Sequence, residues 1–170
     1  NALDEQGFTD NPIIVFAGDN GLAVGQHGLM GKQNCYEHSV HVPLIFAGPG
    51  IPEDNRSDAF VYLLDTYRTL CDLTGMEVPA SVEGESLVEA MRDPDVGVRE
   101  SLYFAYVSSM RAVKNRTHKL IEYAPRGDRN TQLFNLEEDP WELHNLVGEP
   151  GSNEIVDAMR QDMFRYRDDW

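Results

Sequence analysis

The sequence has few basic residues. Among its 170 residues, 14 are Lys or Arg and 29 are Asp or Glu, so the formal net charge is −15. A surface this acidic repels the phosphate backbone of nucleic acids and anionic membranes, so non-specific nucleic-acid binding is not expected. An anionic small molecule is also repelled at long range. A site for one must therefore use a few local positive groups in a cleft.

Cysteine and long apolar runs are scarce as well. The two cysteines, Cys35 and Cys71, match no CxxC spacing, and a disulfide between them stays open. No apolar run approaches the ~20 residues that cross a bilayer, so no membrane span is predicted. The chain begins NALDEQGF, without an initiator Met or a leader pattern. We therefore expect that a segment is missing upstream, which leaves the cellular compartment unknown.

The residues that are present favour a folded domain. Hydrophobic residues make up 41% of the chain, enough for one domain with a core, or for a large lobe with a small appendage. The runs 13–17 and 42–47 are apolar on both faces, which predicts strands buried in a parallel or mixed sheet between helices. Apolar residues at helical spacing predict a helix over 60–74 that ends at Gly75.

The C-terminal part predicts a different architecture. Four short β-type runs occupy 102–107, 110–114, 118–123 and 132–136. Turn-rich breaks at 115–117 and 126–130 separate the last three of these runs, which is typical of an antiparallel meander. Apolar residues over 153–170 predict a helix against that sheet. The fold class is therefore α/β, with the C-terminal part of a larger α/β lobe over 1–98 and a small antiparallel sheet with a C-terminal helix over 99–170.

One stretch, DNGLAVGQHGLMGKQNCYE over residues 19–37, carries most of the chemical information. Asp19 and Asn20 lie at the carboxyl end of the first predicted strand, where α/β sheets bind ligands, and a hard cation prefers such oxygen donors. His27 lies between glycines, where packing is not expected to be its purpose, and Lys32 offers a charge to an anionic ester. The pattern indicates half of a metal-assisted ester hydrolase site. Asp-Asn-Gly is also a common turn, and a lone His or Lys is usually structural or solvated, so these alternatives stay open.

These residues resemble the formylglycine-dependent sulfatases of the alkaline phosphatase superfamily. The likeness begins with VFAGDNGLAVGQHGLMGKQNCYEHSVHVPLIFAGPGI and continues in LLDTYRTLCDLTGMEVPASVEGESL and QLFNLEEDPWELHNL, in the order of the family's own segments. It covers the chain from about residue 3 to 150. The resemblance implies part of a mixed-sheet lobe followed by a four-stranded antiparallel sheet against a helix.

The resemblance also implies roles for single residues. Asp19 and Asn20 fall on two metal ligands, which suits Ca²⁺, with Mg²⁺ as the alternative. Lys32 falls on the lysine that binds the sulfate, and His27 falls in a segment that lines the pocket, so both are candidate catalytic residues.

Four further residues are expected to stay outside the chemistry. Tyr36 and Glu37 are expected to hold the motif loop in place. Lys114 and Lys119, in the predicted meander, are expected to be nearly silent when replaced.

The family's nucleophile is missing from this sequence. It is a formylglycine made from a Cys/Ser-x-Pro/Ala-x-Arg motif, and neither Cys35 nor Cys71 begins one. We expect the formylglycine in a missing N-terminal part, so the chain alone is expected to be inactive. Expected partners are a sulfate ester and the missing half, or a second copy at an exposed sheet edge. The resemblance to the family implies export from the cell.

Two other functions stay open on this sequence. One is a phosphonate or phosphate monoester hydrolase of the same superfamily. The other is a non-catalytic module whose acidic surface binds a partner or Ca²⁺.

Overall fold

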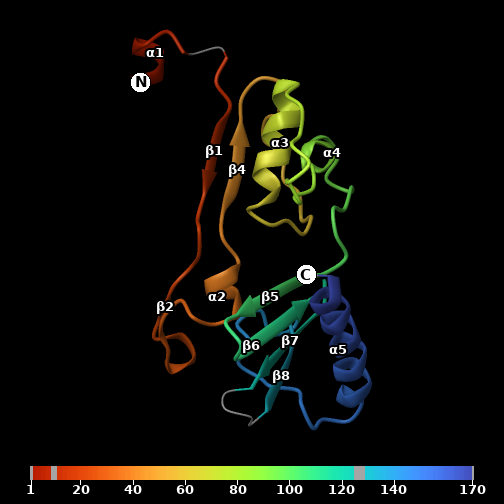
Figure 1. The fold of residues 1–170 in the computed structure, drawn as a ribbon. Coiled ribbons are helices and arrows are strands. Elements are labelled where there is room, and N and C mark those ends of the chain that lie inside the picture. Colours follow the sequence, from red (N-terminus) through yellow and green to blue (C-terminus); the bar gives the residue numbers. More distant parts are fainter. Residues whose placement is uncertain (1, 9–10, 125–128, 170) are drawn as a thin grey trace. The chain divides into compact units, whose positions relative to one another are not determined.

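The computed structural model describes residues 2–8, 11–124 and 129–169 (Figure 1). The chain divides into two compact units, Asn1–Asp19 with Pro43–Arg99 and Asn20–Val42 with Glu100–Trp170. The segment Asn20–Val42 belongs with the C-terminal residues because its side chains bond to theirs, as where the Tyr36 hydroxyl donates to Gln132 Oε1 at 2.9 Å. A functional boundary between residues 98 and 99 stays a prediction.

The described part of the first unit contains a two-stranded sheet and three helices. β1 (Ile14–Ala17) pairs antiparallel with β4 (Leu44–Ala47), so both predicted strands are confirmed. The helices are α1 (Ala2–Glu5), α3 (Asp65–Thr74) and α4 (Val88–Arg92).

The predicted burial of these two strands is wrong for this chain. Ile14, Phe16 and Ile45 are 48%, 61% and 56% exposed. Among the described residues no third strand pairs with β1 or β4. These three side chains share one face of the ribbon, because Phe16 lies opposite Ile45, and that face is open to water, although the apolar pattern is typical of a strand covered on both sides.

The start of α3 is set by a buried carboxylate. Asp65 is fully buried and accepts the backbone N–H of Tyr62 at 2.7 Å and that of Glu85 at 2.8 Å. The Arg99 guanidinium donates to both of its oxygens, at 2.6 and 2.7 Å. These bonds start the helix later than its apolar pattern predicts, and Gly75, with φ of 70°, ends it as predicted.

The second unit is built on a four-stranded antiparallel sheet in the order β5-β6-β7-β8. The strands are Leu102–Tyr106, Met110–Lys114, His118–Tyr123 and Asn130–Asn135. Ala112 lies opposite Ile121, and Leu120 lies opposite Leu133. The predicted meander is thereby confirmed, whereas the break predicted at 126–130 lies partly outside the described residues.

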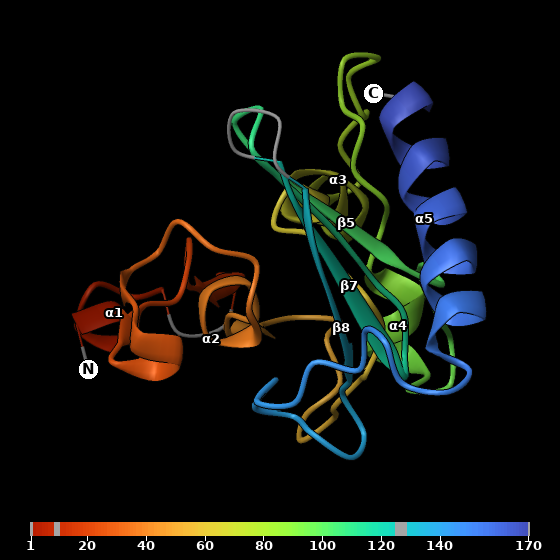
Figure 2. The same ribbon diagram turned by 90° about the horizontal axis from the view of Figure 1, so that it is seen from below.

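Both faces of this sheet are covered. α5 (Ser152–Asp169), the predicted C-terminal helix, packs on one face through a cluster of Val113, Leu120, Leu133, Val156, Met159 and Met163. The other face holds a cluster of Cys35, Tyr36, Met110, Ala112, Ile121 and Phe134. Figure 2 shows α5 and the segment with α2 (Glu37–Val40) on opposite sides of the sheet. No described helix is long and apolar enough to cross a membrane.

Candidate functional site

A small hairpin carries most of the motif residues. β2 (Ala23–Val24) pairs antiparallel with β3 (Met30–Gly31), and the 3-10 turn η1 (Gln26–Gly28) joins them. Before the hairpin, the Gly21 N–H donates to the carbonyl oxygen of Ser39 at 2.9 Å. A Cβ at Gly21 would overlap the carbonyl oxygen of His38, so only glycine lets the chain close here.

His27 is held in a defined orientation on the hairpin turn. Its backbone is left-handed, with φ of 54°. Its ring stacks on Tyr36 with centroids 3.9 Å and planes 4° apart, and its Nε2 lies 3.1 Å from the carbonyl oxygen of Trp141. The expectation that packing is not its purpose is therefore wrong, because the stack fixes the plane of the ring.

His38 extends this aromatic stack. Its ring centroid lies 5.6 Å from that of His27 and 5.7 Å from that of Tyr36. Burial lowers the pKa of His38, and the charges of His27 and Lys119 lower it further. The His38 ring is therefore largely neutral at pH 7.

The structure brings Lys32 and Asn20 together. Lys32 Nζ donates to Asn20 Oδ1 at 2.8 Å, and Asn20 Nδ2 donates to the carbonyl oxygen of Gly21 at 2.8 Å. The Lys32 side chain is exposed and Asn20 is half-buried, so the pair is open to a ligand. Asp19 is exposed, and it is the neighbour of Asn20 in the sequence.

Behind the motif lies a buried cluster of charges that sequence reasoning missed. Lys119 is fully buried, and its Nζ lies 2.6 Å from Glu37 Oε1, 2.7 Å from Glu142 Oε1 and 3.0 Å from the carbonyl oxygen of Cys35. Lys114 Nζ donates to the other oxygen of Glu37 at 2.7 Å. Glu142 and the Cys35 carbonyl accept hydrogen bonds from the Lys119 ammonium, and Glu37 forms an ion pair with it, so that opposite charges offset its desolvation.

This cluster determines the charge of Glu37. Burial by itself would raise the pKa of Glu37. The hydrogen bond with His41, the charge of Lys119 and the hydrogen bonds from Lys114 and Lys119 outweigh burial and hold that pKa well below its ordinary range. Glu37 is therefore ionised at neutral pH, and its backbone N–H donates to Glu142 Oε2 at 2.7 Å.

Tyr36 and Glu37 have the contacts that their expected roles require, whereas Lys119 does not fit its expected role. Glu37 and Tyr36 make the contacts expected of residues that hold the loop in place. The expectation that Lys119 is silent on replacement does not fit its complete burial between two carboxylates. One signal was readable beforehand: in an alternating strand, Lys119 shares a face with Ile121, a core residue.

The motif supplies only part of a metal site. Among residues 2–8, 11–124 and 129–169, no group of three or more His, Cys, Asp or Glu side chains surrounds a possible ion. The carboxylate of Asp19 and the amide oxygen of Asn20 are the hard donors that Ca²⁺ and Mg²⁺ prefer. Since Ca²⁺ takes about six to eight oxygen ligands, the donors fit the ion in type and not in number.

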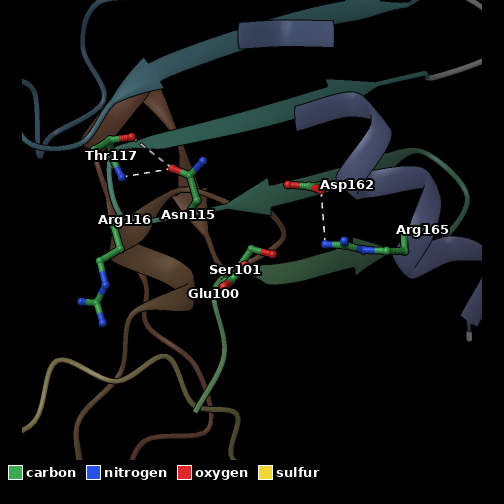
Figure 3. Close-up of a pocket in the computed structure, with 7 residues that line it drawn as sticks. All are labelled: Glu100, Ser101, Asn115, Arg116, Thr117, Asp162 and Arg165. Atoms are coloured by element: carbon green, nitrogen blue, oxygen red, sulfur yellow. Dashed lines mark hydrogen bonds and ion pairs between the residues drawn. The ribbon is translucent and has the colours of Figure 1, made fainter. Parts of the chain in front are cut away.

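A separate polar cavity lies in the second unit. It has a volume of about 330 Å³ and is lined by Glu100, Ser101, Asn115, Arg116, Thr117, Asp162 and Arg165 (Figure 3). Arg165 pairs with Asp162 at 3.2 Å, and the Arg116 side chain points away from that pair. None of the four predicted site residues lines it, so it is distinct from the motif.

Sequence comparison gives consistent matches. The sequence model of a family described as N-sulphoglucosamine sulphohydrolase, C-terminal, matches residues 25–169. A curated protein of Formosa agariphila, named sulfatase, is 32% identical over 161 residues, which cover 94% of this chain and 31% of that protein. The chain spans about a third of the length of the curated relatives that it matches.

Solved structures share the fold. A protein in complex with its substrate, D-glucosamine-2-N,6-O-disulfate, superposes with a TM-score of 0.84 at 24% identity, over 98% of this chain and 36% of that one. The phosphonate monoester hydrolase of Agrobacterium radiobacter superposes with a TM-score of 0.80 at 21% identity, over 99% of this chain and 37% of that one. The predicted fold class is confirmed by these likenesses.

Proposed function

The chain belongs to the N-sulphoglucosamine sulphohydrolase C-terminal family, and from this premise we propose that the full-length protein is a sulfatase, an enzyme that hydrolyses sulfate esters. The predicted resemblance to the C-terminal portion of a sulfatase is confirmed by this membership. The observation that supports the activity best is the 2.8 Å contact between Lys32 Nζ and Asn20 Oδ1. It puts a cation next to a proposed metal-ligating amide.

Lys32 is the proposed sulfate-binding residue. It is exposed on a protein of net charge −15, so its local field offsets a long-range repulsion of the anionic substrate. A fixed ammonium favours the charge that develops on the ester oxygens during cleavage more than the charge of the bound substrate. His27, held by Tyr36 and Trp141, would donate to the ester only in its protonated form, either as a hydrogen-bond donor to an anionic oxygen or as an acid to the leaving group.

Asp19 and Asn20 are the proposed metal ligands of this chain. They would hold Ca²⁺, or alternatively Mg²⁺, together with ligands from outside the 170 residues. Such an ion, when bound, supplies electrostatic stabilisation of the sulfate oxygens. Because two donors are too few for Ca²⁺, residues 1–170 alone should bind it weakly, and tight one-to-one binding in a calorimetric titration of this chain would contradict the assignment.

The nucleophile is proposed to come from outside this sequence. The 170 residues contain no Cys/Ser-x-Pro/Ala-x-Arg motif, so a formylglycine would have to be supplied by another part of the full-length protein. Cys35 is an unsuitable nucleophile, because burial raises the pKa of its thiol to about 11. This chain by itself should therefore be catalytically inactive.

A phosphonate or phosphate monoester hydrolase is the second candidate, and it is supported by the shared fold with the Agrobacterium enzyme. Turnover of 4-nitrophenyl sulfate, 4-nitrophenyl phosphate and a phenyl phosphonate ester by the full-length protein separates the two. Faster turnover of the sulfate supports the sulfatase. Preference for a phosphorus ester supports the second candidate, and no turnover of any ester supports a non-catalytic acidic binding module.

The exposed β1–β4 sheet is the proposed surface through which this chain associates with a partner. Ile14, Phe16 and Ile45 are more than 45% exposed on it, and exposed apolar sheets tend to associate. The remainder of the full-length protein or a second copy is the proposed partner. Sedimentation of residues 1–170 tests this proposal: association with concentration is expected, and a cooperatively melting monomer at high concentration would contradict it.

A further inference from the structure

One turn contacts the motif segment on both sides of Lys32. The Trp141 carbonyl oxygen lies 3.1 Å from His27 Nε2, and Glu142 Oε2 accepts the Glu37 backbone N–H at 2.7 Å. His27 precedes Lys32 in the chain and Glu37 follows it. Two adjacent residues thus hold the segment that presents the lysine.

Glu142 is itself held in an unusual state. Its side chain is 1% exposed, and its carboxylate pairs with buried Lys119 at 2.7 Å. Its backbone has φ of 57°, a conformation that is unfavourable for a residue with a Cβ. Such strain persists where surrounding contacts enforce it, and it is common next to functional sites.

The contacts at His27 leave little freedom to its ring. Stacking on Tyr36, with planes 4° apart, sets the ring plane. Because a carbonyl oxygen only accepts, the Trp141 contact requires the proton on Nε2 and so selects one tautomer of the neutral ring. Nδ1 is then the ring nitrogen that can meet a ligand, and in this tautomer it is a hydrogen-bond acceptor.

We propose that Glu142 is a positioning residue: it anchors the turn whose Trp141 carbonyl fixes His27 as the Nε2–H tautomer, so that Nδ1 faces the ligand. In the neutral ring Nδ1 accepts a hydrogen bond, and it donates one to an ester oxygen only after the ring takes up a second proton there. The identity of that ligand, a sulfate ester, rests on the proposed function. The tautomer of the His27 ring does not depend on that function. Glu142 acts through the turn and through Glu37 and does not touch the substrate.

Nitrogen NMR of the imidazole of His27 tests the proposal on the chain of residues 1–170, with His27→Gln to assign the signal. The wild type should show the Nε2–H tautomer. Glu142→Ala should lose this preference in the folded protein, whereas Glu142→Gln, which keeps an acceptor for the Glu37 N–H, should retain it. Glu138→Ala is the matched control, because Glu138 is an exposed carboxylate close to Glu142 in the sequence and accepts no bond from Glu37.

Two results would overturn the proposal. One is an Nδ1–H tautomer, or an even mixture, in the wild type, which decides the matter even if Glu142→Ala does not fold. The other is an unchanged tautomer in a folded Glu142→Ala chain.

Kinetics of the full-length protein separate this proposal from the sulfatase assignment. Glu142→Ala should lower kcat/KM for an aryl sulfate about tenfold or more, mainly through kcat, as misplacement of a catalytic group does. Glu142→Gln should stay within about threefold of the wild type. A fixed tautomer in a protein without sulfatase turnover would refute the enzyme function and support the positioning role.

Discussion

Lys32 and Lys119 belong to the same unit but differ in their exposure and in their partners. Lys32 is exposed and donates to one neutral amide, whereas Lys119 is fully buried between two carboxylates and a carbonyl oxygen. A buried ammonium is tolerated only with partners that offset its desolvation, so Lys119 is committed to these groups. An exposed one keeps donors for a ligand. The charge that holds the loop is therefore separate from the charge that we propose to act on substrate.

The largest expected effect is on stability and comes from Lys119→Met. Removing the ammonium leaves Glu37 and Glu142 buried next to each other, and breaking a buried pair in this way typically costs about 3–5 kcal/mol. Urea unfolding of the purified chain measures it. Arg92→Ala, which removes an exposed charge, should change stability by less than about 0.5 kcal/mol. A Lys119→Met loss as small as that of the control would mean that the cluster does not stabilise the fold.

Lys32→Ala should lower the activity of the full-length protein and leave its stability nearly unchanged. The loss of one preorganised charge partner should lower kcat/KM for an aryl sulfate about 10²-fold or more, with unfolding free energy nearly unchanged. Gln33→Ala, at the next exposed position, serves as the control. A decrease of less than about threefold for Lys32→Ala would make Lys32 an ordinary solvated residue.

The pH dependence of stability tests the contribution of the Glu37 charge next to Lys119. Because its contacts lower the pKa of Glu37 in the folded state, Glu37 contributes stability that is fully present above its ordinary pKa of about 4.3 and is lost as the pH falls through the lower, folded-state value. The stability advantage of the wild type over Glu37→Gln should therefore shrink as the pH falls below about 5. Urea midpoints at a series of pH values measure it. A constant difference would show that Glu37 acts without its charge.

The smallest expected effect concerns Cys35, next to the same cluster. Burial raises the pKa of its thiol to about 11, although the charge of Lys119 acts to lower it. The thiol should therefore stay unreactive at pH 8 until the chain unfolds. Labelling with a thiol reagent, with the site assigned by mass spectrometry, should follow unfolding by urea. Rapid labelling of Cys35 in the native chain would contradict its burial.

Much of the fold could be predicted from the sequence because its signals are local. Short β-type runs between turn residues identify the strands of the meander, and the amphipathic pattern identifies α5. The start of α3 could not be predicted, because it depends on bonds from Asp65 to Glu85 and Arg99 that are distant in the chain. The antiparallel pairing of β1 with β4 is likewise a long-range contact that apolarity does not encode.

The candidate site was predictable in composition and not in arrangement. Asp19, Asn20, His27 and Lys32 were named from one stretch of sequence, and the structure brings Asn20 and Lys32 into contact. The support of His27 by Trp141 joins residues far apart in the chain, so no motif spacing reveals it. The ligand roles of all four residues stay predictions.

Turnover of an aryl sulfate by the full-length protein and by its Asp19→Ala variant tests the central claim most directly. If Asp19 is a metal ligand of a sulfatase, the wild type should turn over the ester, and the variant should lose about 10²-fold or more in kcat/KM while remaining folded, with a weakened response to added Ca²⁺. Asp72→Ala, which removes an exposed carboxylate of α3, should change neither quantity. Equal turnover by the wild type and Asp19→Ala would contradict the assignment of this segment to a metal-dependent sulfatase site.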